Sequence, residues 1–333
     1  MKKILVLVSM IMIIGLLAAC GQSANSNKPA SQNTAGEAAE GITPEVAAPE
    51  NTSTDTAASA PDFIVHAANA KIASMSIHIT SNLLALGITP IGSVVGGDVK
   101  DFLPHVADLL KGATKYGTVS DPDMEALLAS KPDYIYLDEE YSGKDLSKFE
   151  KIAPTIVVDM NKGTWRDHLK LLAQHVGKEK EADAFIQDYA TKAERVQTLV
   201  HNELGADARV MAIRMTAKEL RVMSTGNPVG PIMFEDLKLK PAVGVEKIGA
   251  DKPFEVISKE VLPDFDADAI FVIISVGSEA KSNFEEMEKN AVWQNLKAVK
   301  NKHVYILDGQ RWLDYSSMGQ SMALDDAEKL FTK

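Results

Sequence analysis

The sequence predicts an α/β fold with largely parallel sheets. Short β-branched runs alternate with helical patterns from residue 62 onward, and 45% of the chain is hydrophobic, which suits a packed core. Lys178–Leu204 contains no Gly or Pro and repeats apolar residues three and four apart, which predicts one helix of about 25 residues. This helix is either a strut between two α/β lobes or a long helix within a single domain, and the residues alone leave both possibilities open.

The first 19 residues have the pattern of a signal peptide. Lys2 and Lys3 precede an apolar run from Ile4 to Ala19, in which Ile4–Gly15 is long enough for a signal h-region but short for a membrane-spanning helix of about 20 residues. Leu17-Ala18-Ala19-Cys20 resembles a bacterial lipobox, in which the cysteine is lipidated and becomes the mature N-terminus. We therefore expect a lipid anchor on Cys20, such as a diacylglycerol or palmitate group, that holds the protein on the extracytoplasmic side of a cell membrane. The alternative is an ordinary signal peptide with a chance cysteine.

Residues 20–61 are expected to form a flexible linker behind the lipidated cysteine. This segment is almost wholly Ser, Ala, Asn, Thr, Gly, Pro and Glu. Such a composition buries too little apolar surface to offset the entropy of ordering the chain. If the long helix joins two lobes, they span residues 62–177 and 205–333.

The expected strands are short, mostly β-branched and bounded by Gly, Pro, Asp or Asn. They are Phe63–His66, Lys71–Met75, Pro90–Val94, Tyr134–Leu137, Thr155–Val158, Val210–Arg214, Leu220–Ser224, Ala269–Ile274 and His303–Leu307. Between them we expect a helix at Ser81–Leu86 that stops at Gly87, and another at Asp121–Ser130 with Asp121 as its N-cap.

Composition and motifs exclude several functions. A formal net charge of −11 argues against nucleic acid, whose recognition needs concentrated Lys and Arg. The single cysteine excludes a Cys-cluster metal site, and the seven histidines are scattered, so no metal-ligand set is expected. Ser278-Glu279-Ala280-Lys281 fits Ser-x-x-Lys, but the companion motifs of penicillin-interacting enzymes are missing. We therefore expect no enzyme activity.

Several segments in order resemble one known family. They are Leu84–Gly92, Gly117–Asp133, Pro154–Val158, Ile257–Leu262 with Ala267-Asp268, and Trp293–Tyr305. Behind a lipobox, this order is similar to that of the substrate-binding lipoproteins of bacterial ABC importers for iron–siderophore complexes, a group that includes haem and vitamin B12 binders. The resemblance covers about residues 62–331. It implies two α/β lobes joined by a single long helix, with the ligand in the cleft between them.

The resemblance implies a ferric siderophore as the transported ligand, an ABC permease as the membrane partner and no covalent cofactor. We expect a monomer. Zinc, manganese, haem and cobalamin remain alternative ligands, and a structural surface lipoprotein is the alternative outside transport. Gly226–Pro231 lacks the Trp and Arg of hydroxamate binders, which weakens a ferrichrome-type assignment and leaves catecholate and citrate chelates open.

Ferric siderophores are usually anionic or rich in oxygen donors, so a cleft that binds one needs cations and aromatic faces. Arg214 ends an apolar strand, where an arginine is costly unless it is paired or faces a wet cleft. Trp312 and Tyr315 follow the strand His303–Leu307. Tyr315 is the better cleft candidate, because Trp312 could instead belong to the core.

Four further residues are weaker candidates for ligand contact. Lys100 and Lys115 lie in or after loops, His78 ends the loop Ser74–His78 that follows an early strand, and Tyr141 could stack on a ligand. Glu125 and Glu260 match the two glutamates, one per lobe, by which such proteins dock onto their permease. They could equally be acids favoured by the dipole of a first helical turn.

Overall fold

The computed structural model describes residues 66–67, 69–97, 99–139 and 145–332. The chain divides into Met1–Ala58 and Ser59–Lys333, and all described residues belong to the second unit. The signal peptide, Cys20, the linker and Tyr141 therefore lie outside the described residues, as does most of the strand expected at Phe63–His66. None of the helices in the described part combines the length and apolarity that a membrane crossing requires.

The first lobe is built on a six-stranded sheet in the order β4-β3-β2-β1-β5-β6. All neighbouring strands are parallel except β3 and β4. The strands are β1 (Ile72–Ser74), β2 (Gly92–Val95), β3 (Thr114–Thr118), β4 (Asp121–Pro122), β5 (Tyr134–Asp138) and β6 (Thr155–Val158). The helices are α1 (Ile77–Ala85), the 3₁₀-helix η1 (Ala107–Leu110), α2 (Met124–Ser130), α3 (Ser147–Glu150) and α4 (Trp165–Val176).

The second lobe has a sheet in the order β10-β8-β7-β11-β12, and β9 also pairs with β7. Its strands are β7 (Arg209–Met215), β8 (Leu220–Met223), β9 (Lys240–Pro241), β10 (Phe254–Ile257), β11 (Ala269–Ile274) and β12 (Val304–Leu307). Its helices are η2 (Pro231–Asp236), η3 (Val245–Lys247), η4 (Lys259–Phe265), α6 (Ser278–Glu288), α7 (Ala291–Asn295), α8 (Lys297–Lys300), α9 (Gly309–Trp312) and α10 (Ser317–Phe331).

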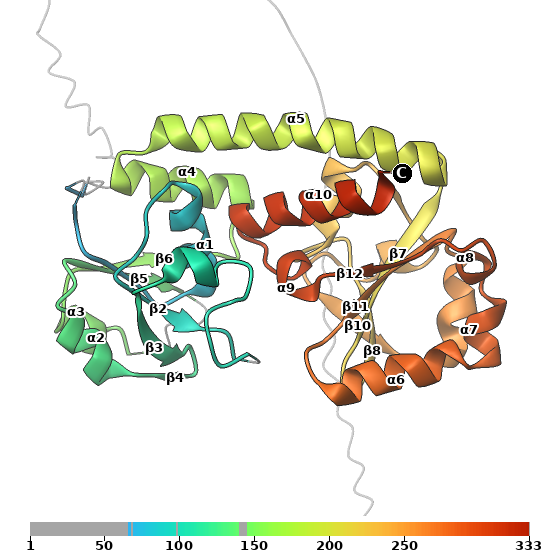
Figure 1. The fold of residues 1–333 in the computed structure, drawn as a ribbon, viewed down its shortest axis with the longest axis horizontal. Coiled ribbons are helices and arrows are strands. Elements are labelled where there is room, and N and C mark those ends of the chain that lie inside the picture. Colours follow the sequence, from blue (N-terminus) through green and yellow to red (C-terminus); the bar gives the residue numbers. More distant parts are fainter. Residues whose placement is uncertain (1–65, 68, 98, 140–144, 333) are drawn as a thin grey trace, which may run out of the picture. The chain divides into compact units, whose positions relative to one another are not determined.

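A single helix, α5 (Glu179–Leu204), connects the two lobes. Figure 1 shows it running along both of them, with α4 and α10 beneath it. One face is buried at helical spacing, through Ala182, Tyr189, Ala193, Val196 and Val200. This confirms the expected fold of two α/β lobes on one long helix, although α5 begins one residue later than predicted because Lys178 is its N-cap.

One continuous hydrophobic core spans both lobes. It contains Leu169 of α4, Val196 of α5, and Phe271 and Trp312 of the second lobe. At the edge of this core, which includes the Tyr189 ring, the Asp236 carboxylate accepts hydrogen bonds from Arg166 of α4 at 2.8 Å and from the Tyr189 hydroxyl at 2.7 Å. The lobes are therefore tied together beneath α5 by apolar packing and by a polar cluster, which favours small rather than large closing motions.

Two expected helices have different starts in the structure. The first begins at Ile77, not Ser81, because the Ser76 side chain accepts a hydrogen bond from the backbone of Ile79 and caps it. The second begins at Met124, since Asp121 and Pro122 pair with β3 and Asp123 is the N-cap. The sequence analysis missed β3, in which Lys115 and Gly117 interrupt the strand-favouring Thr and Tyr residues, and it also missed β4, β9 and β10.

We predict that a buried histidine makes the first lobe sensitive to acid. His66 stacks on Tyr134 with ring centroids 3.6 Å apart, and its Nε2 lies 2.6 Å from the Tyr136 hydroxyl oxygen. Burial, and then the charge of His175, lower the pKa of His66 from 6.5 to about 4. The unfolded chain therefore binds a proton at this site that the folded chain rejects, so stability falls as the pH drops from about 6.5 to about 4.

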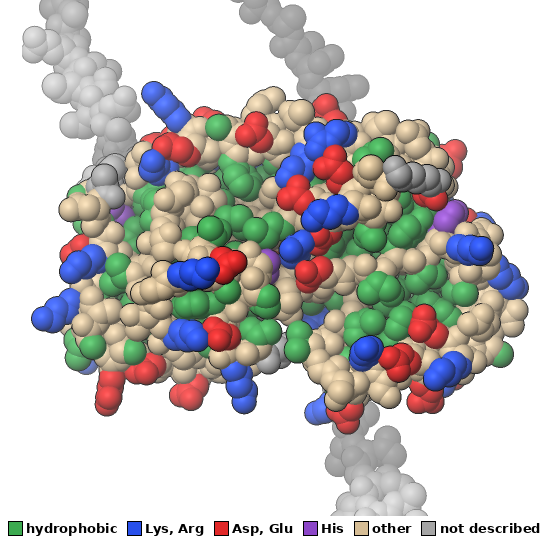
Figure 2. All heavy atoms as spheres, in the orientation of Figure 1, with side chains coloured by type: hydrophobic (Ala, Val, Ile, Leu, Met, Phe, Trp, Pro, Cys, Tyr) green, Lys and Arg blue, Asp and Glu red, His purple; other side chains and the backbone are tan. Residues whose placement is uncertain are grey.

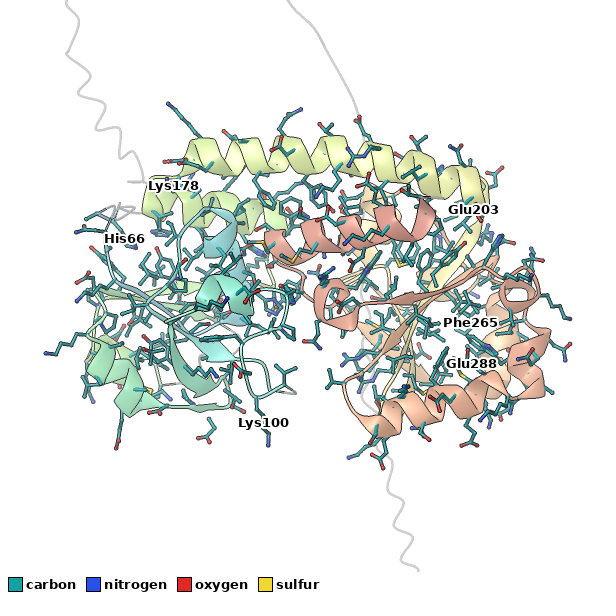
Figure 3. The ribbon with its side chains drawn as sticks, in the orientation of Figure 1. His66, Lys100, Lys178, Glu203, Phe265 and Glu288 are labelled. Carbon is teal, nitrogen blue, oxygen red and sulfur yellow. The ribbon has the colours of Figure 1, made fainter. Side chains whose placement is uncertain are left out.

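Chemical unfolding of the wild type and of His66→Gln at pH 7 and at about pH 5 tests this prediction. The wild type is expected to lose more free energy of unfolding between these pH values than the variant, because the amide does not titrate. An equal loss of free energy of unfolding in both proteins would show that His66 does not cause the acid sensitivity. His66 lies at the same end of the first lobe as Lys178 (Figure 3), away from the second lobe.

Candidate functional site

A cavity of about 280 Å³ lies between the lobes and is lined from both sides. The first lobe contributes Ile77 and His78 from α1 and Val99 from the loop after β2, and the second contributes Arg214 and Ser275. The carboxyl ends of the parallel strands β7 and β11 reach it, where ligand sites of α/β sheets commonly form. A cleft of this kind is what the two-lobed architecture implied.

A second cavity, of about 550 Å³, adjoins the first. Arg214 and Leu313 line both cavities, so these two residues lie where the compartments meet. The described residues that line the second cavity are Asn161, Arg214, Met223, Asn227, Pro228, Ala250, Asp251, Pro253, Phe254, Leu313 and Tyr315. The second volume is in the range of small-molecule sites and the first is just below it, and the mixed polar and apolar lining suits a metal chelate with an organic scaffold.

Arg214 occupies the position that the sequence analysis expected. It lies in β7 next to Ile273 of β11, and its Nε donates a hydrogen bond of 2.8 Å to the Ser275 hydroxyl oxygen. This bond fixes the plane of the guanidinium at the junction of the two cavities. A guanidinium held in this way is suited to directional contacts with the oxygens of an anionic ligand.

His78 and Tyr315 form a stacked pair across the lobes. Their ring centroids are 3.7 Å apart and their planes are inclined by 30°. His78 lines the first cavity and Tyr315 the second. The sequence analysis chose both residues as cleft candidates, but it placed His78 in a loop, whereas the Ser76 cap puts it in the first turn of α1.

Asp314 is a buried residue that the sequence analysis missed. Its carboxylate lies 3.1 Å from Nδ1 of His78 and 3.0 Å from Nε2 of His105, and it also accepts a hydrogen bond from the backbone of Ser316. Burial alone would raise its pKa, but the hydrogen bonds from His105 and His78 outweigh burial and hold the pKa of Asp314 well below its usual range. No sequence pattern could reveal it, because its two histidine partners are 236 and 209 residues away.

Trp312 belongs to the core and not to the cleft, which corrects the expectation that it contacts the ligand. Its side chain is fully buried and packs against Phe271, with ring centroids 6.4 Å apart. It is the last residue of α9, a short helix whose N-cap is Asp308. A residue without exposed surface cannot touch a ligand in this conformation.

The two lysine candidates do not line either cavity. Lys100 is exposed in a turn with a positive φ of 51°, at the outer tip of its loop (Figure 3), whereas the neighbouring Val99 faces the first cavity. Lys115 forms an ion pair of 2.9 Å with Asp101, and its side chain is about half exposed. Neither lysine therefore belongs to the lining of these cavities, to which the loop after β2 contributes apolar residues such as Val99 and Leu103.

Glu125 and Glu260 both lie in the first turn of a helix and are exposed. Glu125 belongs to α2 in the first lobe and Glu260 to η4 in the second. Hydrogen bonds from its own backbone and from Ser258 lower the pKa of Glu260, which keeps this carboxylate charged. Acidic and basic side chains are interspersed on the face in view (Figure 2). The electrostatic effect of a single exposed carboxylate on this face is therefore short-ranged.

Among the described residues, no group of three or more His, Cys, Asp or Glu side chains is arranged to hold a metal ion. His78, His105 and Asp314 come closest in composition, but their separations of 3.0 and 3.1 Å are hydrogen-bond distances. Besides apolar residues, the described lining of the cleft contains Arg214, the stacked His78–Tyr315 pair and uncharged or acidic side chains such as Asn161, Asn227 and Asp251.

Two lobes on one long helix with a cleft between them have the architecture of a two-lobed solute-binding protein. Residues 72–311 match the model of the periplasmic binding protein family, so the chain belongs to this family. It is 30% identical over 263 residues to the probable siderophore-binding lipoprotein YfiY of Bacillus subtilis, a match that covers 76% of this chain and 80% of that protein.

Two solved structures share the fold. The iron-uptake system-binding protein FeuA of Bacillus subtilis is 27% identical with a TM-score of 0.70, and the match covers 81% of this chain and 97% of FeuA. Staphylococcus aureus SirA in complex with staphyloferrin B is 25% identical with a TM-score of 0.69, covering 80% of this chain and 94% of SirA. These relatives show the same two lobes and long helix.

Proposed function

We propose that this chain captures a ferric siderophore, or a related iron chelate, and delivers it to an ABC permease. The observation that carries this proposal is the cleft, in which Arg214 lies between two cavities lined by both lobes. SirA, which shares the fold, has been solved with staphyloferrin B, and YfiY is named as siderophore-binding. We propose binding and release without catalysis.

Titration of tryptophan fluorescence with ferric chelates tests the proposal. The panel comprises ferrioxamine B as a hydroxamate, ferric enterobactin as a catecholate, ferric citrate, and haem. At least one ferric chelate is expected to quench the fluorescence of the buried tryptophans saturably, with the iron-free chelator as control. No saturable quenching by any member would contradict the proposed function.

We also propose that Cys20 carries a lipid anchor and that the protein acts as a membrane-tethered monomer. Cys20 lies outside the described residues, so this proposal rests on the lipobox-like Leu17-Ala18-Ala19-Cys20 and on the linker composition. Replacing Cys20 with serine is expected to release the protein from membranes into the soluble fraction.

The exposed glutamates are proposed to dock the loaded protein onto the permease. Glu125→Ala and Glu260→Ala are each expected to reduce uptake of ⁵⁵Fe-chelate by roughly fivefold, and the double variant to abolish it, because each removes one exposed charge pair with the partner. The chelate Kd should not change, since neither residue lines the cleft cavities.

Matched controls separate docking from a general loss of acidic charge. Glu150→Ala in α3 and Glu279→Ala in α6 each remove an exposed glutamate from one lobe. Both controls are expected to transport at the wild-type rate. Wild-type uptake by the double variant would exclude Glu125 and Glu260 from docking.

A further inference from the structure

A buried cluster of titratable side chains lies at the lobe boundary, where His78 and Asp314 line the first cavity. The side chains of Asp314 and His105 are 1% and 2% exposed, and that of His78 is 10% exposed. Asp314 follows α9 in the second lobe, whereas His78 and His105 belong to separate segments of the first lobe. One carboxylate therefore joins two parts of the first lobe to the second.

The hydrogen-bond pattern indicates how the rings are held. Nδ1 of His105 is buried without a hydrogen-bond partner among the described residues, so the tautomer that carries its hydrogen on Nε2, facing Asp314, leaves no buried donor unsatisfied. His78 faces the same carboxylate through Nδ1. Asp314 thus determines the orientation of both rings across the lobe boundary.

The local backbone is shaped to keep Asp314 in place. Its Oδ1 accepts a hydrogen bond of 3.0 Å from the backbone of Ser316, the N-cap of α10. A Cβ at Gly319 would overlap the backbone oxygen and Cβ of Asp314, so only glycine permits this close approach. Next to the cluster, the Asn82 side chain of α1 accepts two hydrogen bonds from Ser317, which adds a second buried contact across the boundary.

We propose that Asp314 is a positioning residue of the ligand site. By holding His78 across the lobe boundary, it presents the stacked His78–Tyr315 pair to the ligand beside Arg214. This inference rests on the proposed function and adds that the ligand contacts this pair through an oxygen-rich or planar chelating group. Among the three residues of the cluster, His105 lines neither cavity, so it acts on the ligand only through Asp314.

Two variants and one control test this role. Asp314→Asn keeps the shape and removes the charge, and His105→Ala removes one donor from outside the cleft. The control is Asp236→Asn, because Asp236 also joins elements of both lobes by hydrogen bonds to Arg166 and Tyr189 and lines neither cavity. All three variants are expected to be less stable than the wild type.

The expected result separates positioning from stability. The Kd for the chelate of the panel that binds the wild type most tightly should rise on the order of tenfold in Asp314→Asn, by analogy with carboxylates that orient metal-binding histidines, and by a smaller factor in His105→Ala. It should stay unchanged in Asp236→Asn. In the ligand-free protein, the imidazole ¹⁵N resonances of His78 should shift in the first two variants and not in the control.

Binding by Asp314→Asn within twofold of the wild type would overturn the inference, as would unchanged His78 resonances in that variant. If no chelate binds the wild-type protein, the proposed function fails. The resonances of the ligand-free protein then still decide whether Asp314 orients His78, so the two failures are distinguishable.

Discussion

Arg214→Ala is expected to weaken binding of the ferric chelate by roughly 10- to 100-fold. A hydrogen bond to a charged group contributes about 1.5–3 kcal/mol, and each 1.4 kcal/mol corresponds to a factor of ten in Kd. Arg214 lines both cavities, and its guanidinium is oriented by Ser275, so its loss affects the point where the compartments meet. Fluorescence titration of the purified variant measures the effect.

Arg209→Ala is the matched control for this prediction. Arg209 lies at the opposite end of β7, where it donates a hydrogen bond of 3.1 Å to the backbone oxygen of Pro241. The variant carries the same loss of charge and is expected to bind the chelate like the wild type. Equal Kd values for Arg214→Ala and Arg209→Ala would exclude Arg214 from the site.

Trp312→Ala is expected to lower the free energy of unfolding by about 3–5 kcal/mol, the cost of replacing a fully buried large aromatic residue with alanine. The indole has no exposed surface and lies in the core that is continuous between the lobes. Urea unfolding of the variant measures the loss, and the milder Trp312→Phe keeps the protein folded for binding studies.

The same residue distinguishes a core role from a cleft role. Trp312→Phe is expected to lose stability while its chelate Kd remains within twofold of the wild-type value. Wild-type stability together with weakened chelate binding in this variant would instead indicate that Trp312 contacts the ligand. The smaller Trp312→Phe change makes this comparison possible even if Trp312→Ala does not fold.

Local patterns predicted the parts of the fold that are encoded locally. The long helix was evident because 26 residues without Gly or Pro carry an apolar face, and the buried strands were evident from their β-branched runs. Arg214 was also predictable, because an arginine that ends an apolar strand needs a polar or wet environment. These features depend on neighbours within a few residues.

The residue assignments that the sequence could not make depend on tertiary contacts. Trp312 and Tyr315 lie three residues apart in the same segment, and only packing decides that the first is buried against Phe271 and the second stacks on His78. Asp314 was invisible because an aspartate between apolar residues has no local signature. Lys100 and Lys115 have the charge that the expected ligand requires, but Lys100 is exposed in its turn and Lys115 of β3 pairs with Asp101.

The core shared by the two lobes and α5 limits how far the lobes can move apart. Because packed side chains are continuous from α4 through α5 to Trp312, large separation of the lobes would expose part of the core. The buried contacts of Asp314 and Asn82 add polar constraints at the same boundary. We therefore expect chelate binding to change the orientation of the lobes only slightly.

A crystal structure of the protein with a bound ferric chelate, phased on the anomalous signal of iron, tests the central claim most directly. The account predicts one iron peak between the lobes, with chelate oxygens in contact with Arg214 and the chelate beside the His78–Tyr315 pair. Iron bound elsewhere on the surface, or a chelate that leaves Arg214 untouched, would contradict it.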